Sequence, residues 1–88
     1  MVQKELEVLT RAGIHARPAS VISGIAQKYP CDVTIVKDSM TINAKSIMGI
    51  ITLGAIYKTK LTLITDGDGE KECAEEMEQA FLNRFDVQ

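Results

Sequence analysis

One histidine and one arginine, two positions apart, are the residues of this chain best suited to chemistry. His15 is the only histidine among 88 residues, and Arg17 is followed directly by Pro18. Because proline fixes φ and lacks a backbone N–H, it is typical of the first turn of a helix. An imidazole at a helix start lies beside unpaired N–H groups and the positive end of the helix dipole. With a guanidinium in reach, His15 is predicted to be able to hold a phosphoryl group.

The helix that positions His15 is predicted from the apolar residues that follow it. These residues are spaced for one face of a helix: Ala19, Ile22, Ile25, Ala26 and Tyr29. The helix is therefore expected to begin near Ala16, which leaves His15 at or just before the first turn. Taken alone, this position also fits a histidine that only caps the helix or faces solvent.

Ser46 is a second candidate position, because it precedes a short and very apolar run that ends at Gly54. A serine before an apolar helical run is typical of an N-cap, which contributes on the order of 1 kcal/mol. Ile47, Met48 and Ile51 offer more apolar surface than so short a helix can bury on one side. They are interpreted either as core residues or as a partly exposed patch used for docking.

The remaining elements follow from apolar alternation and turn residues. Strands are predicted at 5–9, 33–36, 40–43 and 61–65, and a third helix at about 70–84. The resulting order, βαββαβα, leaves room for two layers only. We therefore expect an α+β open-faced sandwich, in which three helices cover one face of a four-stranded antiparallel sheet. The pattern alone fits the general ferredoxin-like class equally well.

Composition indicates one globular domain over residues 1–88, with 45% hydrophobic and 25% charged residues. The net charge of −2 conceals an asymmetry: residues 1–60 have a balance of +4 and residues 61–88 a balance of −6. A polarised surface of this kind favours an acidic partner or substrate. Nucleic acid is not expected as a partner, because no aromatic residues interleave with the basic ones.

Metal and redox chemistry are both poorly supported. Cys31 and Cys73 belong to no CxxC pattern, and Cys73 is expected on the buried face of the last helix. The segment Asp66–Glu70 resembles the start of a calcium loop, but Lys71 and Met77 stand where that pattern requires glycine and glutamate. We therefore expect a tight turn there and no metal site. With no secretory signal and no long apolar run, a cytoplasmic protein without membrane insertion is expected.

Two motifs resemble those of the HPr family, the histidine-containing phosphocarrier proteins of the bacterial phosphoenolpyruvate-dependent sugar phosphotransferase system. The string Gly-Ile-His-Ala-Arg-Pro-Ala-Ser at 13–20 is similar to the family's active-site signature. Lys-Ser-Ile-Met-Gly at 45–49 resembles its regulatory-serine motif, at the family's usual distance from the histidine. The similarity covers essentially the whole chain, and it favours the HPr fold over the general ferredoxin-like class.

The resemblance implies a phosphocarrier and not an independent enzyme, with no cofactor. His15 would accept a phosphoryl group on Nδ1 from Enzyme I and pass it to a sugar-specific Enzyme IIA. The N–H groups of Ala16 and Arg17 and the guanidinium of Arg17 would stabilise the phosphate. The resemblance further implies phosphorylation of Ser46 by an HPr serine kinase/phosphorylase and docking through Ile47, Met48 and Ile51. A monomer is expected.

A regulatory protein is the alternative interpretation. Such a protein would be a nitrogen-branch relative, or a co-repressor that binds a transcriptional regulator when Ser46 is phosphorylated. The neighbouring Met48 and Gly49 resemble the sugar branch more. The chain also departs from the family's pattern, since Lys58 stands where a glycine is usual and Ala12 where a polar residue is common. Either Lys58 adopts a positive φ, at a cost of about 1 kcal/mol, or the loop is rebuilt.

Overall fold

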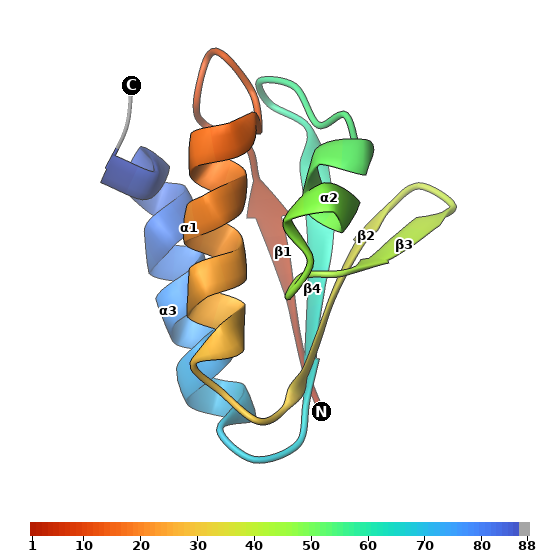
Figure 1. Ribbon diagram of the computed structural model, residues 1–88, viewed down its shortest axis with the longest axis vertical. Helices are drawn as coiled ribbons and strands as arrows, with labels where there is room; N and C mark the ends of the chain where they lie inside the picture. Colours follow the sequence, from red (N-terminus) through yellow and green to blue (C-terminus); the bar gives the residue numbers. More distant parts are fainter. Residues whose placement is uncertain (87–88) are drawn as a thin grey trace.

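The computed structural model describes residues 1–86 and confirms the predicted order of elements (Figure 1). The elements are β1 (Val2–Glu7), α1 (Ala16–Gln27), β2 (Asp32–Lys37), β3 (Met40–Asn43), α2 (Ile47–Thr52), β4 (Lys60–Asp66) and α3 (Glu70–Leu82). A 3-10 turn, η1 (Arg84–Asp86), follows α3 and was not predicted. The last helix ends at Leu82 because residues 84–86 each adopt a φ of 57°, outside the α-helical region.

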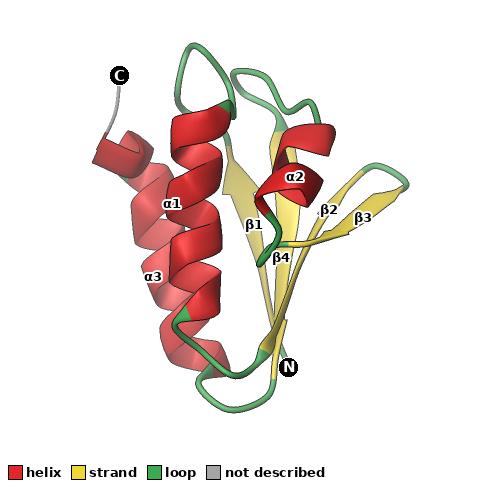
Figure 2. Cartoon of the chain, in the orientation of Figure 1, coloured by secondary structure: helices red, strands yellow, loops and turns green. Residues whose placement is uncertain are grey.

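The four strands form one antiparallel sheet in the order β1-β4-β2-β3. Leu6 of β1 lies opposite Leu61 of β4, and Leu63 of β4 lies opposite Ile35 of β2. All four side chains are buried, so they belong to the face that the helices cover. Figure 2 shows the three helices on this one face and none on the other, as expected for an open-faced sandwich.

The core lies between the sheet and the helices. One face of α3 is buried and consists of Cys73, Ala74, Met77, Ala80 and Phe81. Phe85 of η1 extends this face, with its ring 4.7 Å from that of Phe81 in an edge-to-face arrangement. This aromatic contact anchors η1 against the end of α3. The Arg84 Nε of η1 also donates to the carbonyl oxygen of Leu9 at 3.3 Å, so the turn lies beside the loop that precedes α1.

Candidate functional site

The loop before α1 has a defined conformation that presents His15. Gly13 adopts a φ of 75°, and its N–H donates to the carbonyl oxygen of Thr10 at 3.0 Å. The buried Thr10 hydroxyl in turn donates to the carbonyl oxygen of Gly13 at 2.9 Å. A Cβ at position 13 would lie 2.7 Å from the carbonyl oxygen of Ala55, so only glycine fits there. That same oxygen accepts the N–H of Ile14 at 3.0 Å, which ties the loop to the segment after α2.

His15 is the N-cap of α1, at the position that the sequence predicted. Its backbone is extended (φ −109°, ψ −163°), and its carbonyl oxygen accepts the first helical hydrogen bond, from the N–H of Ala19 at 2.9 Å. The imidazole is exposed and makes no capping hydrogen bond to the helix. His15 thus occupies the N-cap position, but the geometry does not support the interpretation that its side chain serves to cap the helix.

The first turn of α1 offers free donors next to this imidazole. Within residues 1–86, neither the N–H of Ala16 nor that of Arg17 has a hydrogen-bond partner, and Pro18 has no N–H. The Arg17 side chain is exposed and forms no ion pair with any described residue. An anion held at this helix start would thus meet two backbone donors and a guanidinium.

Ser46 is the N-cap of α2, and its hydroxyl is used. The Ser46 Oγ accepts the N–H of Gly49 at 3.1 Å. The opposite end of α2 is also satisfied, because the ammonium of Lys37 donates to the carbonyl oxygen of Leu53 at 2.8 Å. The short helix is thus held at both ends by side chains. Figure 1 shows α1 beginning at the upper end of the molecule, whereas α2 begins near mid-height and runs upward, so α2 lies between Ser46 and the end that carries His15.

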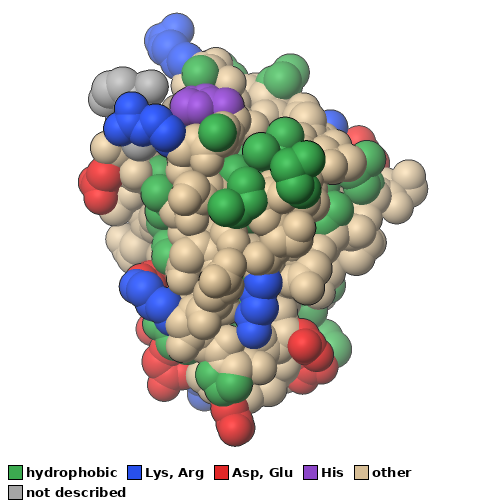
Figure 3. All heavy atoms as spheres, viewed as in Figure 1, with side chains coloured by type: hydrophobic (Ala, Val, Ile, Leu, Met, Phe, Trp, Pro, Cys, Tyr) green, Lys and Arg blue, Asp and Glu red, His purple; other side chains and the backbone are tan. Residues whose placement is uncertain are grey.

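The apolar side chains of α2 divide between core and surface. Ile50 is fully buried, whereas Ile47 is 41%, Met48 70% and Ile51 37% exposed. We call these three exposed side chains the apolar patch. In Figure 3 hydrophobic side chains gather on the face below the histidine. The sequence did not predict the exposure of Ile56, which is 71% exposed, because this residue follows the helix and belongs to no periodic pattern.

Lys58 takes the first of the two conformations considered from the sequence. Its φ is 71°, in the left-handed region, and the loop keeps its course without a glycine. The N–H of Lys58 donates to the carbonyl oxygen of Val8 at 2.7 Å, and the N–H of Val8 donates to that of Thr59 at 2.9 Å. These two hydrogen bonds hold the loop beside the end of β1 and offset the strain at Lys58.

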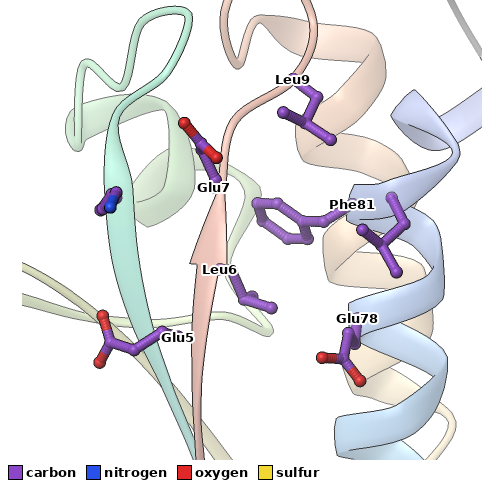
Figure 4. A pocket seen from close by; sticks show the side chains of 8 residues that line it. Glu5, Leu6, Glu7, Leu9, Glu78 and Phe81 are labelled. Atoms are coloured by element: carbon purple, nitrogen blue, oxygen red, sulfur yellow. The ribbon is translucent and has the colours of Figure 1, made fainter.

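Other parts of the described chain offer less for chemistry. A groove of about 260 Å³ between β1 and α3 has Leu6, Leu9 and Phe81 in its walls and several carboxylates around them (Figure 4). It contains none of the candidate residues. Both cysteines are free and buried, and burial raises the pKa of the Cys73 thiol to about 12, which disfavours the reactive thiolate.

Two further findings concern metals and membranes. Within residues 1–86, no group of three or more histidine, cysteine, aspartate or glutamate side chains could bind a metal ion. The segment from Asp66 to Glu70 is a turn in which the carboxylate of Glu70 accepts the N–H of Gly67 at 2.9 Å. Of the helices described, none combines the length and the apolar character needed to span a bilayer.

Comparison with known proteins places these features in one family. The family model "PTS HPr component phosphorylation site" matches residues 2–83. The phosphocarrier protein HPr of Treponema pallidum is 38% identical over 86 residues, which cover 98% of each chain. The HPr-like protein Crh of Bacillus subtilis is 40% identical over 77 residues, covering 88% of this chain and 91% of Crh.

Solved structures agree with this assignment. The structure of HPr-C-His from Thermoanaerobacter tengcongensis superposes with a TM-score of 0.95 at 32% identity, covering 100% of this chain and 99% of that one. The structure of HPr from Bacillus anthracis gives a TM-score of 0.86 at 36% identity over 91% of this chain and 95% of that one. The chain therefore belongs to the HPr family, the phosphocarrier proteins of the phosphotransferase system.

Proposed function

We propose that His15 accepts a phosphoryl group from Enzyme I and passes it to a sugar-specific Enzyme IIA. One observation carries this proposal: His15 is an exposed N-cap residue whose imidazole makes no hydrogen bond to its own helix. A capping imidazole would have its lone pair engaged. Here the lone pair is available, and the helix N–H groups of Ala16 and Arg17 are available as well.

The proposed transfer is an in-line displacement between two nitrogens. The lone pair of His15 Nδ1 forms a bond to phosphorus as the bond from phosphorus to the histidine of Enzyme I breaks, and that histidine keeps the electron pair. Charge on the three equatorial oxygens is stabilised by the N–H groups of Ala16 and Arg17 and by the Arg17 guanidinium. Transfer to Enzyme IIA is the same step with His15 as the leaving group. No cofactor is expected in this step.

We propose that partners dock on the apolar patch, because it is exposed and lies on the same face of the molecule as His15. Met48→Asp is expected to weaken binding to Enzyme I by more than about thirtyfold, the loss typical of a central interface residue. Met40→Asp is a matched control, because Met40 is 40% exposed and lies on β3. Isothermal titration with Enzyme I and circular dichroism measure the two effects. Equal losses for both variants, or an unfolded Met48→Asp, would contradict docking at the patch.

We also propose that an HPr serine kinase/phosphorylase modifies Ser46. A phosphate at this N-cap would carry a charge of about −2, which the N-terminus of a helix favours, so α2 should persist. The new charge would border the apolar patch, where its desolvation opposes docking. Phosphorylation of Ser46 would then slow transfer to His15 without unfolding the protein.

The decisive experiment is incubation of the protein with phosphoenolpyruvate and catalytic Enzyme I, followed by intact mass and phosphosite mapping. One acid-labile phosphoryl group on His15 is expected, because a phosphoramidate hydrolyses in acid. No mass increase, or label on a serine, would contradict the proposal. Adding individual Enzyme IIA proteins to the phosphorylated form identifies the acceptor. We expect a monomeric, cytoplasmic carrier, and light scattering of the sample tests the first point.

A regulatory role is the second candidate, and the 40% identity to the HPr-like protein Crh favours it. One solved structure of Bacillus subtilis Crh describes it as a catabolite repression protein. In this role the Ser46-phosphorylated form would bind a transcriptional regulator. If no Enzyme IIA accepts the phosphoryl group while Ser46-phosphorylated protein binds a regulator, the second candidate replaces the first.

A further inference from the structure

A pocket at the end of the molecule that carries His15 has no part in the transfer described above. It has a volume of about 280 Å³ and is lined by Leu9, Arg11, Tyr57 and Arg84. Three segments that are far apart in the sequence build it: the loop between β1 and α1, the loop between α2 and β4, and η1. Figure 1 shows these three segments together at the upper end of the fold.

Positive charge converges on the single aromatic ring of this pocket. The guanidinium carbon of Arg11 lies 5.7 Å from the centroid of the Tyr57 ring, and the ammonium nitrogen of Lys58 lies 5.5 Å from it. Both cations are thus within cation–π distance of one ring. Arg84 adds a third positive charge in the wall of the pocket.

No carboxylate neutralises these cations within residues 1–86. None of the ion pairs found there includes Arg11, Lys58 or Arg84, and no acidic side chain lines the pocket. The groove between β1 and α3 differs in this respect, because three carboxylates line it. In Figure 3, most visible acidic side chains lie at the opposite end of the molecule. Cations gathered without a counter-charge repel one another unless an anion binds between them.

Backbone and side-chain contacts hold the pocket in place without a ligand. Tyr57 directly precedes Lys58 in the chain, and the N–H of Lys58 donates to the carbonyl oxygen of Val8 at 2.7 Å. The Arg84 Nε donates to the carbonyl oxygen of Leu9 at 3.3 Å, which orients the guanidinium across the pocket. Lys58 and Arg84 also adopt positive φ values, of 71° and 57°, which glycine or asparagine would adopt at a lower cost in free energy. The chain therefore retains strained cations at this place.

We propose that this pocket binds a compact anion of the diphosphate type, with two phosphoryl groups joined by a short linker. One guanidinium group can bind two oxygens of a phosphoryl group at once. Arg11 and Arg84 approach from separate segments, so each can bind one phosphoryl group. Lys58 supplies a further positive charge, while Leu9 and Tyr57 provide an apolar wall for the linker. The volume admits a small ligand and excludes a large one. This binding is independent of phosphoryl transfer through His15.

The test is a titration of the isotope-labelled protein with pyrophosphate, followed by amide chemical shifts at constant ionic strength. Saturable shifts are expected at Arg11, Tyr57, Lys58 and Arg84. Arg11→Gln and Arg84→Gln are each expected to weaken binding at least tenfold. Lys71→Gln, which removes the same charge from an exposed side chain at the start of α3, is expected to bind as the wild type does.

Three results would overturn the proposal: no saturable shift at millimolar pyrophosphate, equal weakening by Lys71→Gln, or shifts centred on Ala16 and Arg17. The last result would mean that pyrophosphate occupies the helix start beside His15. The His15→Ala variant separates the two sites, because it should lose phosphorylation and keep pyrophosphate binding. Arg11 and Arg84 are both exposed, so circular dichroism of their variants is expected to match the wild type.

Discussion

The starts of α1 and α2 share a backbone conformation but differ in whether a side chain caps the helix. Both N-cap residues have an extended backbone, with a φ of −109° at His15 and −106° at Ser46. At α2 the Ser46 hydroxyl accepts the N–H of Gly49, whereas at α1 the imidazole of His15 accepts nothing from its helix. One helix start is therefore closed by its own cap, and the other is left open to solvent.

The difference shows where stability has been given up. Leaving a helix start without a capping side chain costs about 1 kcal/mol relative to a serine, threonine, asparagine or aspartate cap. At α1 this cost leaves two backbone donors and the imidazole of His15 without partners in the helix, as the proposed phosphoryl transfer requires. At α2 the cap is retained, which is consistent with a residue whose first role is to hold a short helix. A phosphate on Ser46 would then add to an existing structural function.

His15→Asn tests the open start most directly and has the largest expected effect. Asparagine has no imidazole nitrogen to accept a phosphoryl group, so phosphorylation from phosphoenolpyruvate and Enzyme I should vanish. The free energy of unfolding should rise by about 0.5–1 kcal/mol, because the new side chain caps the helix. Intact mass and denaturant unfolding measure the two effects, and His15→Ala is the control that loses phosphorylation without gaining a cap. Unchanged or lower stability for the asparagine variant would mean that the start of α1 is not an uncapped one.

Ser46→Asp has the next largest expected effect and separates charge from capping. Aspartate can cap α2 as serine does, so stability should change little. Its negative charge next to the apolar patch should slow phosphorylation of His15 about tenfold, since one interaction of roughly 1.4 kcal/mol corresponds to that factor. Ser46→Asn is the matched control, because it caps without charge and should transfer at the wild-type rate. Equal rates for the two variants would remove the electrostatic explanation.

Ser46→Ala should act in the opposite way, on stability and hardly on transfer. Loss of the hydroxyl leaves the N–H of Gly49 without its partner, which should cost about 1 kcal/mol. For a domain of this size such a loss lowers Tm by roughly 4–8 °C. Differential scanning calorimetry measures the shift, and the rate of His15 phosphorylation should stay within about twofold. A variant with wild-type Tm would show that the cap of α2 is dispensable.

Much of this molecule was predictable because its signals are local. Alternating apolar residues defined the strands, and Pro18 with the spacing of Ala19 and Ile22 placed the start of α1 one residue after His15. The position of His15 at a helix start needed no tertiary information. The exposure of Met48 was left open, since periodicity gives the apolar residues of a helix but not how many of them the core can cover.

The features that escaped prediction depend on contacts between distant segments. The turn η1 exists because Phe85 packs on Phe81, and no propensity scale anticipates a φ of 57° at phenylalanine. Whether Lys58 or a rebuilt loop would replace the usual glycine depended on hydrogen bonds to Val8, which follows β1 and precedes Lys58 by about 50 residues in the sequence. The cap at Ser46 was predicted, whereas the sequence left open whether the side chain of His15 caps its helix.

The start of α3 completes the comparison with the smallest expected effect. Its N-cap, Gly69, has a φ of 80° and no side chain, but the carboxylate of Glu70 accepts the N–H of Gly67. This hydrogen bond, followed by one from the ammonium of Met1, holds the pKa of Glu70 below its ordinary value. The carboxylate therefore stabilises the fold above the unfolded-state pKa of about 4.3. That contribution is lost as the pH falls through the lower pKa of the folded state, because the unfolded chain takes up the proton first.

Glu70→Gln should therefore be less sensitive to acid than the wild type. The decrease in Tm between pH 7 and pH 3 should be smaller in the variant, because a neutral amide has no proton to gain in that range. Glu75→Gln, an exposed carboxylate of the same helix with no hydrogen bond to any described residue, is the matched control and should follow the wild type. Phosphorylation of His15 should be unchanged in both, since α3 begins at the opposite end of the fold from α1. If Glu70→Gln loses as much Tm in acid as the wild type, the carboxylate does not hold this helix start, and α3 would resemble α1 in being left open.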